Sequence, residues 1–188
     1  LMPQVMKDAV LAAEDARFYE HGGVDYKGVA RAALANLRDA RSEGASTITM
    51  QVVKNEFLAG LERDGRYKVL QARYATMLEK EVPKKKILER YLNTIYLGNN
   101  TYGIQAAAEV YFGKDVRELT LLDGAFLAGL IQAPSNYDPI QHPDTSRARY
   151  LEVLDRLVDT GLLTEHERIE IGDKPAIPEC QQRNTINI

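Results

Sequence analysis

The sequence contains a single cysteine, Cys180, and no tryptophan. One cysteine cannot form a disulfide within the chain, so cysteine usage leaves the redox compartment open. The formal net charge of −3 argues against a general nucleic-acid binder, which would show a strong basic excess. The most apolar run, residues 121–133, contains Asp123 and is too short to cross a bilayer. The opening LMPQVMKDAV does not resemble a signal peptide, so any membrane anchor is expected outside this sequence.

The 188 residues are 45% hydrophobic and 27% charged, which is typical of a soluble globular protein with a sizeable core. This length fits one domain of ordinary size. Apolar residues recur at helical spacing along most of the chain, with no internal repeat and no convincing strand. The predicted fold class is therefore mainly α.

The first predicted helix leads into a pair of acids. Its apolar stripe consists of Val5, Met6, Ala9, Val10 and Ala13. Glu14 and Phe18 continue an i, i+4 row of this stripe, and the glycines of segment 21–23 are expected to end the helix. Burying charge is costly. Glu14, with Asp15 beside it, is therefore either a functional carboxylate or an ordinary exposed acid at a helix end.

Further helices are predicted after this one. We expect a helix from about Tyr26 to Leu37 and another that begins after Ser46 or Thr47 as N-cap. The polar, glycine-containing segment 58–68 is predicted to be a mobile loop. The remaining helical segments are expected at 69–78, 83–95, 104–112 and 145–160, with one more opened by Thr164.

Two of the helix ends have a local sequence signal. Gly113 is expected to close the helix at 104–112, and Thr120 with Asp123 resembles a capping box that opens a helix at 121–131. This last helix is apolar nearly all round and is therefore expected to be central.

Three stretches, AAEDARFYEHGGVD, GASTITMQVVKN and ILERYLNTIYLGNNTYGIQAAAEVYFGK, resemble in order and spacing the peptidoglycan glycosyltransferases of glycosyltransferase family 51. These are the polymerising domains of class A penicillin-binding proteins and of monofunctional transglycosylases. The resemblance implies a lysozyme-like helical lobe with a small flexible jaw subdomain. It assigns residues 1–172 to the glycosyltransferase domain, 58–68 to the mobile jaw loop and 173–188 to a linker or tail.

The resemblance implies an inverting reaction that polymerises lipid II into the β-1,4 glycan strands of peptidoglycan, with a lipid diphosphate as leaving group. The expected location is the extracytoplasmic face of the bacterial cytoplasmic membrane. Expected partners are lipid II, the growing glycan chain, the membrane surface, moenomycin-type inhibitors and a covalently linked transpeptidase domain, but no nucleic acid. The chemistry needs a base for the acceptor hydroxyl and positive charge for the departing diphosphate.

Glu14 matches the family's catalytic base. A carboxylate beside apolar Val10 and Phe18 is expected to be partly desolvated, which favours proton uptake. Asp15 matches the second acid of the motif, where it either orients Glu14 or plays a structural part. For Phe18 we expect a packing role that shapes the cleft, and for His21 a hydrogen bond to a turn or loop carbonyl.

The second stretch is a serine- and threonine-rich turn that opens a helix, a natural phosphate site although most such turns are only caps. By the resemblance, Thr47, Gln51 and Lys54 contact the donor's diphosphate and sugar, while Ser46 helps to set the turn. The family usually has two successive glutamines here, and this chain has Met50 before Gln51.

The third family motif reads arginine-lysine, two residues, then a second glutamate. Counting back from ILERYLN places Tyr67, Lys68 and Gln71 on these positions, so only the lysine is retained. Arg63 is close enough in sequence to restore positive charge. The resemblance leaves open Mg²⁺ or Mn²⁺ as cofactor, and Gln71 would bind such a cation less well than a carboxylate. We therefore expect activity reduced by Gln71 and weakly dependent on metal.

Two other functions are consistent with the sequence. The first is a catalytically impaired module that binds lipid II or acts as a scaffold, because Gln71 replaces the second glutamate. The second is a lysozyme-like enzyme that cleaves glycans, although such an enzyme has no use for the phosphate-binding turn near Lys54. Polymer formation from lipid II separates these alternatives from the glycosyltransferase.

Overall fold

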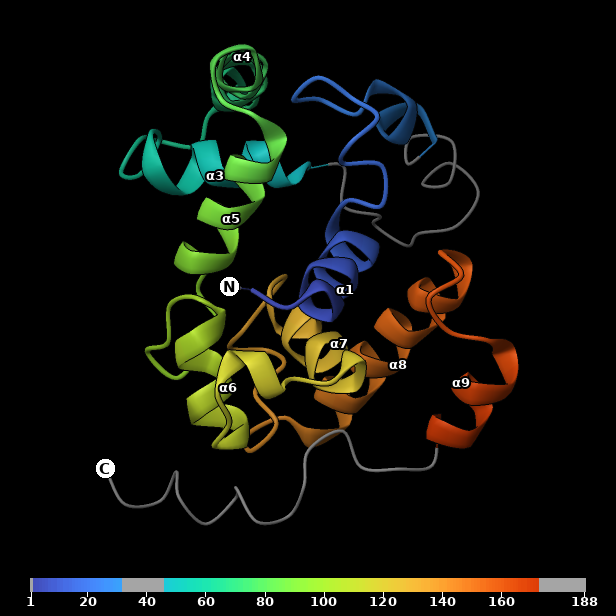
Figure 1. Cartoon of the computed structure of the whole chain (residues 1–188). Helices are drawn as coiled ribbons and strands as arrows, with labels where there is room; N and C mark the ends of the chain where they lie inside the picture. The colour runs from blue at the N-terminus through green and yellow to red at the C-terminus, as the bar shows by residue number, and fades with distance from the viewer. Residues whose placement is uncertain (1, 32–45, 173–188) are drawn as a thin grey trace. The chain divides into compact units, whose positions relative to one another are not determined.

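The computed structural model describes residues 2–31 and 46–172 (Figure 1). The predictions for 32–45, including most of the second helix, and for the tail 173–188 lie outside the described residues. Within the described part the chain is helical and forms no named strand, apart from an isolated bridge between Tyr96 and Tyr102. The mainly α class is confirmed.

The helices follow one another with short connections. They are α1 (Gln4–Glu14), α3 (Ile48–Glu56), α4 (Gly65–Glu81), α5 (Lys84–Thr94), α6 (Ile104–Phe112), the 3₁₀ helix η1 (Val116–Glu118), α7 (Leu121–Leu130), α8 (Pro143–Asp159) and α9 (Glu165–Gly172). Residues 26–31 are also helical. Among the described residues, no helix has both the length and the apolar character that crossing a membrane requires.

The described chain divides into two compact units. Unit 1 consists of residues 2–16 and 92–172, and unit 2 consists of residues 17–31 and 46–91. The boundary after residue 16 follows directly on Glu14 and Asp15, so the acidic pair belongs to unit 1. Phe18, His21 and the whole of α3 and α4 belong to unit 2.

Helix α7 is the centre of unit 1. It packs against α1 and α8, which also contact each other (Figure 1). Its residues from Asp123 to Leu130 are all buried, which confirms the prediction that this helix, apolar nearly all round, is central. Gly124 allows α1 to approach, because a Cβ there would lie 3.2 Å from the Cβ of Ala9.

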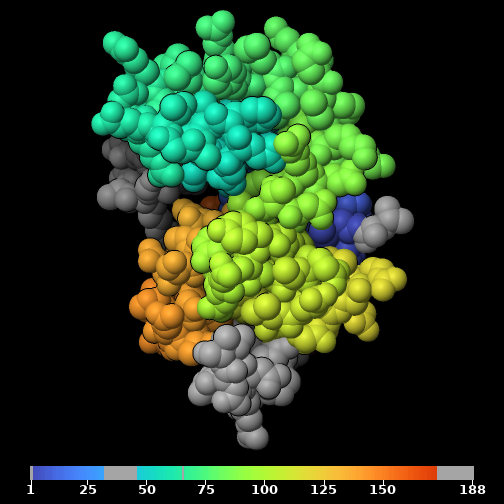
Figure 2. Space-filling view, turned by 90° about the vertical axis from the view of Figure 1, so that its left-hand side faces the viewer, coloured from blue at the N-terminus to red at the C-terminus, as the bar shows by residue number. Residues whose placement is uncertain are grey.

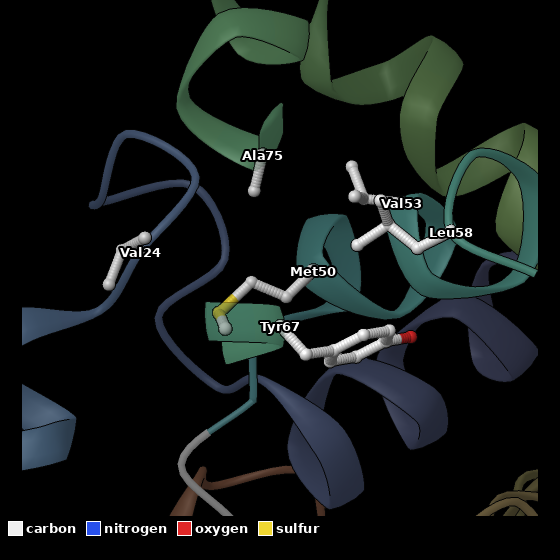
Figure 3. Close-up of a cluster of buried hydrophobic side chains, with 6 residues drawn as sticks. All are labelled: Val24, Met50, Val53, Leu58, Tyr67 and Ala75. Atoms are coloured by element: carbon white, nitrogen blue, oxygen red, sulfur yellow. The ribbon is translucent and has the colours of Figure 1, made fainter. Parts of the chain in front are cut away.

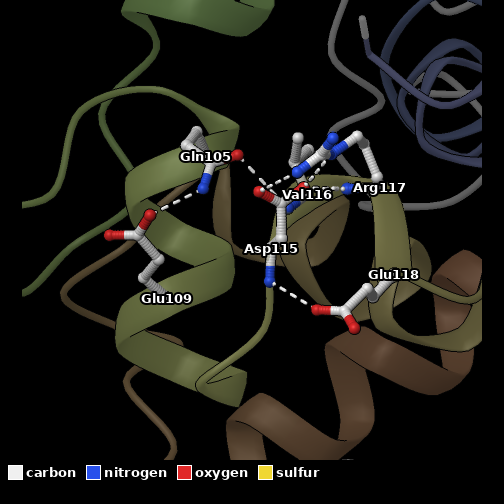
Figure 4. Close-up of polar contacts among 6 residues, drawn as sticks. All are labelled: Gln105, Glu109, Asp115, Val116, Arg117 and Glu118. Carbon is white, nitrogen blue, oxygen red and sulfur yellow. Dashed lines mark hydrogen bonds and ion pairs between the residues drawn. The ribbon is translucent and has the colours of Figure 1, made fainter.

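A polar network joins α6 to η1 in unit 1 (Figure 4). The Gln105 side chain accepts a hydrogen bond from the Val116 N–H at 3.2 Å. The Asp115 carboxylate accepts from the Arg117 N–H at 2.9 Å, and the Glu118 carboxylate accepts from the Asp115 N–H at 2.9 Å. Hydrogen bonds from Arg117 lower the pKa of Asp115 to about 2. The chain is thereby fixed as it leaves α6 and turns towards α7.

Unit 2 has its own apolar core, made of side chains from α3, α4 and the neighbouring loops (Figure 3). Its buried members are Val24, Met50, Val53, Leu58, Tyr67 and Ala75. Because α3 and α4 pack together, their side chains form a continuous surface, turquoise to green in Figure 2. Gly23, with φ +87°, passes so close to α4 that a Cβ would lie 2.6 Å from the Ala75 carbonyl carbon. No other residue fits there without displacing backbone.

Two sequence-based boundaries are wrong. Helix α1 ends at Glu14 and not at segment 21–23, because Asp15 leaves helical geometry with φ −161° and ψ 69°. The chain turns there and carries Phe18 into unit 2. Residues 65–68 are helical and not part of a loop, because the Asp64 side chain caps α4 by accepting from the N–H groups of Arg66 and Tyr67.

Several predicted helix ends are confirmed. Thr47 is the N-cap of α3, and its side chain accepts from the Met50 N–H. Thr120 and Asp123 form the predicted capping box of α7. Gly113, with φ 61°, closes α6 in the left-handed conformation. Each of these ends depends on contacts within about one turn of helix, which explains why the sequence pattern reveals them.

Candidate active site

Glu14 is the last residue of α1, and its side chain is only 10% exposed. The Arg149 guanidinium lies nearby, with Nη2 3.9 Å from Glu14 Oε1. The carboxylate therefore lies in a largely desolvated place beside a positive charge, and such a charge stabilises the ionised form that accepts a proton. The alternative of an ordinary exposed acid does not fit this burial.

Arg149 has no role in the sequence-based prediction, although it contacts the proposed base. Its side chain is 5% exposed, and its Nη1 also pairs with Glu152 Oε2 at 3.0 Å. The sequence contains a signal for it, because Arg149 falls on the buried face of α8 together with Tyr150, Val153 and Leu157. A charge on an apolar helical face is a candidate functional residue, since buried charges need a partner.

Asp15, Phe18 and His21 follow Glu14 along the chain. Asp15 is 8% exposed, and its N–H donates to the Leu11 carbonyl at 2.9 Å to finish α1. Phe18 is 1% exposed within unit 2, where the Lys84 ammonium lies 4.4 Å from its ring centroid. The His21 ring meets Phe18 edge to face, with centroids 6.2 Å apart. Burial of Phe18 supports a packing role; for Asp15 and His21 the expected roles remain predictions.

Three cationic side chains of unit 2, Lys54, Arg63 and Lys68, form what we call the cation cluster. Lys54 lies on α3, Arg63 precedes α4, and Lys68 lies in the first turn of α4. Burial, and then the positive charges of Arg63 and Lys68, lower the pKa of Lys54. Lys68 Nζ also donates to Ser46 Oγ at 2.8 Å. Because these like charges act on one another, the cation cluster favours a bound anion.

The lowered pKa of Lys54 predicts a pH dependence of anion binding. We expect the affinity for inorganic pyrophosphate to fall as the pH rises through this pKa, which lies below the ordinary 10.5, because Lys54 then loses its charge. Isothermal titration calorimetry between pH 7 and 10 measures the change. Lys54→Arg is the matched control, because its guanidinium stays charged over this range. A wild-type profile that coincides with the Lys54→Arg profile would contradict the assignment.

Thr47 and Gln51 make hydrogen bonds inside unit 2. The Thr47 hydroxyl is buried, donates to the Gly23 carbonyl at 2.6 Å and accepts from the Met50 N–H at 3.1 Å. These bonds fix the start of α3 to the turn at Gly23. Gln51 Oε1 accepts from the Tyr91 hydroxyl at 2.9 Å, and Gln51 remains partly exposed. Direct contact of either residue with a donor substrate remains a prediction.

Gln71 lies inside unit 2, on α4, and is 1% exposed. Its Nε2 donates to the Met50 carbonyl of α3 at 2.7 Å. Tyr67, which stands at the family's arginine position, is also buried and belongs to the apolar core. The two charged residues expected from the resemblance are therefore replaced by uncharged residues that pack between α3 and α4.

The described residues do not fit a resident Mg²⁺ or Mn²⁺. These cations prefer several oxygen ligands, above all carboxylates. Within the described ranges, no group of three or more His, Cys, Asp or Glu side chains is arranged to hold a metal ion. The groups that act electrostatically on Lys54 are cations, and Gln71 offers one amide oxygen in a buried position.

Comparison with known proteins gives consistent results. A family model described as transglycosylase matches residues 1–158. A protein of Cupriavidus necator, named as a candidate transglycosylase, is 45% identical over 168 residues, covering 88% of this chain and 71% of that protein. Penicillin-binding protein 1A of Neisseria flavescens is 47% identical over 167 residues, covering 88% of this chain and 21% of the relative.

A solved structure is also similar. The 2.6 Å crystal structure of penicillin-binding protein 1A from Haemophilus influenzae matches with a TM-score of 0.54 and 27% identity, covering 93% of this chain and 16% of that chain. The chain thus spans about a fifth of the length of the penicillin-binding proteins that it matches. The match to the family model ends at residue 158, so the predicted domain end at 172 stays a prediction.

Proposed function

Because the chain belongs to the transglycosylase family, we propose that it polymerises lipid II into the β-1,4-linked glycan strands of peptidoglycan. Glu14 is the general base. It takes the proton from the 4-hydroxyl of the acceptor sugar, whose oxygen attacks C1 of the donor on the face opposite the leaving group. The C1–O bond to the diphosphate breaks, and the α-linked donor becomes a β-linked product.

The cation cluster supports the second half of this reaction. The leaving lipid diphosphate carries the electron pair of the broken bond, and Lys54, Arg63 and Lys68 supply the positive charge that stabilises it. The observation that carries the proposal is that Lys54 is half-buried, and that burial and then the charges of Arg63 and Lys68 lower its pKa. A bound anion would stabilise the charged form of Lys54 against both effects, and a diphosphate provides such an anion.

The base is supported independently within unit 1. Glu14 is largely buried and lies beside Arg149. A positioned base contributes roughly 10²–10⁴ in rate. Arg149 is a positioning residue, because it contacts the carboxylate and not the substrate in this mechanism. No step passes through a divalent cation, because the described residues do not fit one.

The proposed substrate also determines the expected cellular location and partners of the chain. Lipid II is a membrane lipid, so the chain works at the extracytoplasmic face of the bacterial membrane, on a growing glycan strand. A transpeptidase domain in the same polypeptide is consistent with the penicillin-binding protein names of its relatives. Moenomycin-type phosphoglycolipids are expected to compete, since they present a phosphate to the cation cluster.

Incubation of the purified chain with lipid II tests the proposal directly. We expect glycan strands on a denaturing gel, with equal yield in the presence of Mg²⁺ and of a chelator. Binding of lipid II without polymer would instead favour the non-catalytic module. Cleavage of preformed peptidoglycan without use of lipid II would favour the lysozyme-like enzyme. Either result refutes the polymerase.

A further inference from the structure

Gln71 joins α3 to α4 by a buried hydrogen bond. Its Nε2 donates to the Met50 carbonyl at 2.7 Å, and the side chain is 1% exposed. Its Oε1 is buried, and no hydrogen-bond partner for it is found in the part of the chain that the structure describes. Polar groups buried in this way are costly. The Gln71 amide is kept in place despite this cost, and its hydrogen bond to Met50 links α4 to α3.

The two ends of this hydrogen bond lie one helical turn from two members of the cation cluster. Met50 precedes Lys54 by four residues on α3, and Lys68 precedes Gln71 by three residues on α4. Residues at these spacings are neighbours on a helix surface. A shift of α4 against α3 at the Gln71–Met50 contact would therefore change the distance between the Lys54 and Lys68 ammonium groups.

The two lysines oppose the packing that brings them together. Lys68 and Arg63 both disfavour the charged form of Lys54, so their mutual repulsion acts to separate α3 from α4 near this point. The Gln71 hydrogen bond and the surrounding apolar core, which includes Tyr67, act in the opposite direction. Gln71 and Tyr67 are uncharged, so they hold α3 and α4 together without reducing the positive charge of the cation cluster.

We propose that Gln71 is a positioning residue of the anion site, a neutral brace between α3 and α4 that holds Lys54 and Lys68 at the spacing a diphosphate requires. The inference rests on the proposed function, because it takes the cation cluster to be the diphosphate site. The inference gives a different interpretation of the missing glutamate. In this chain, the side chain at position 71 fixes the spacing of the cationic groups, and the absence of a second carboxylate does not impair the anion site.

Gln71→Met tests the brace, because methionine has similar length and volume but cannot donate to the Met50 carbonyl. We expect a cooperatively folded variant whose dissociation constant for inorganic pyrophosphate is raised about three- to tenfold, the range of one net hydrogen bond. Gln132→Met, an exposed glutamine of unit 1, is the matched control and should bind like wild type. Gln71→Asn, which keeps the amide but shortens its reach, serves if methionine prevents folding.

A second measurement separates the brace from the proposed function. Nuclear magnetic resonance titration of the Lys54 side chain reports its pKa, which should rise towards 10.5 in Gln71→Met as Lys68 moves away. A folded Gln71→Met with unchanged Lys54 pKa and unchanged pyrophosphate affinity overturns the brace. If wild type does not bind pyrophosphate, but the Lys54 pKa still rises in the variant, the brace stands and the diphosphate role fails.

Discussion

Glu14→Gln is expected to abolish the polymerisation of lipid II while leaving the chain folded. Glutamine has nearly the same shape but cannot accept the acceptor's hydroxyl proton, so we expect a loss of about 10²–10⁴ in rate. The loss should fall on turnover and not on affinity for pyrophosphate, because Glu14 is the proposed base and is not a member of the cation cluster. A gel assay of glycan strands and calorimetry with pyrophosphate measure the two effects separately.

Glu152→Gln is the matched control for this variant. Glu152 also pairs with Arg149, at 3.0 Å, and its side chain is 62% exposed. Both substitutions remove one negative charge next to the same guanidinium, but only Glu14 is the proposed base. We expect Glu152→Gln to polymerise like wild type. Near-normal polymerisation by Glu14→Gln would refute the role of Glu14, and equal loss in both variants would assign the effect to Arg149.

The helical class and many helix ends could be predicted from the sequence because their causes are local. Thr47, Gly113 and Thr120 act through hydrogen bonds or backbone angles within about one turn, and such patterns survive in any tertiary setting. The predicted end of α1 at segment 21–23 is wrong because its cause is not local. Phe18 continues the i, i+4 row of α1 in sequence, but the chain leaves helical geometry at Asp15 and Phe18 is buried in unit 2, which the row alone does not reveal.

In the candidate site, too, sequence motifs indicate some residues, whereas contacts between distant parts of the chain appear only in the structure. Lys54 and Lys68 match positions of the family motifs, and the structure brings them within electrostatic range of each other. The pairing of Arg149 with Glu14 cannot be predicted, because the two residues are 135 positions apart in sequence and no local pattern connects them. The surroundings of Gln71 were likewise hidden, since a glutamine in a helix gives no sign of whether it faces solvent or the carbonyl of another helix.

Gln71→Glu is expected to destabilise the chain at neutral pH. The new carboxylate would be buried, next to the Met50 carbonyl oxygen that now accepts a hydrogen bond. An ionised carboxylate cannot donate to that oxygen, and a buried charge without an ion pair costs about 3–5 kcal/mol. Lys54 and Lys68 lie one helical turn from this contact and offset only part of the cost. Burial should raise the pKa of the introduced carboxyl group above its unfolded value of about 4.3.

The sign of the pH dependence follows from this raised pKa. Below about pH 4.3 the carboxyl is protonated in both the folded and the unfolded state, and it can donate to Met50 as the amide does. Above that pH the unfolded state releases its proton first, so the free energy of unfolding falls with rising pH until the folded pKa is reached. Urea unfolding at pH 4 and at pH 8 should therefore show a deficit against wild type mainly at pH 8.

Gln132→Glu places the same charge on an exposed position of unit 1 and controls for net charge, so its stability should follow wild type at both pH values. A Gln71→Glu chain that is as stable as wild type at pH 8 would show that position 71 reaches solvent. A large gain in polymerisation would show that the neutral residue impairs the enzyme, as its family position alone suggested. The brace predicts the reverse, because a carboxylate at this position both loosens α3 from α4 and reduces the positive charge near Lys54 and Lys68.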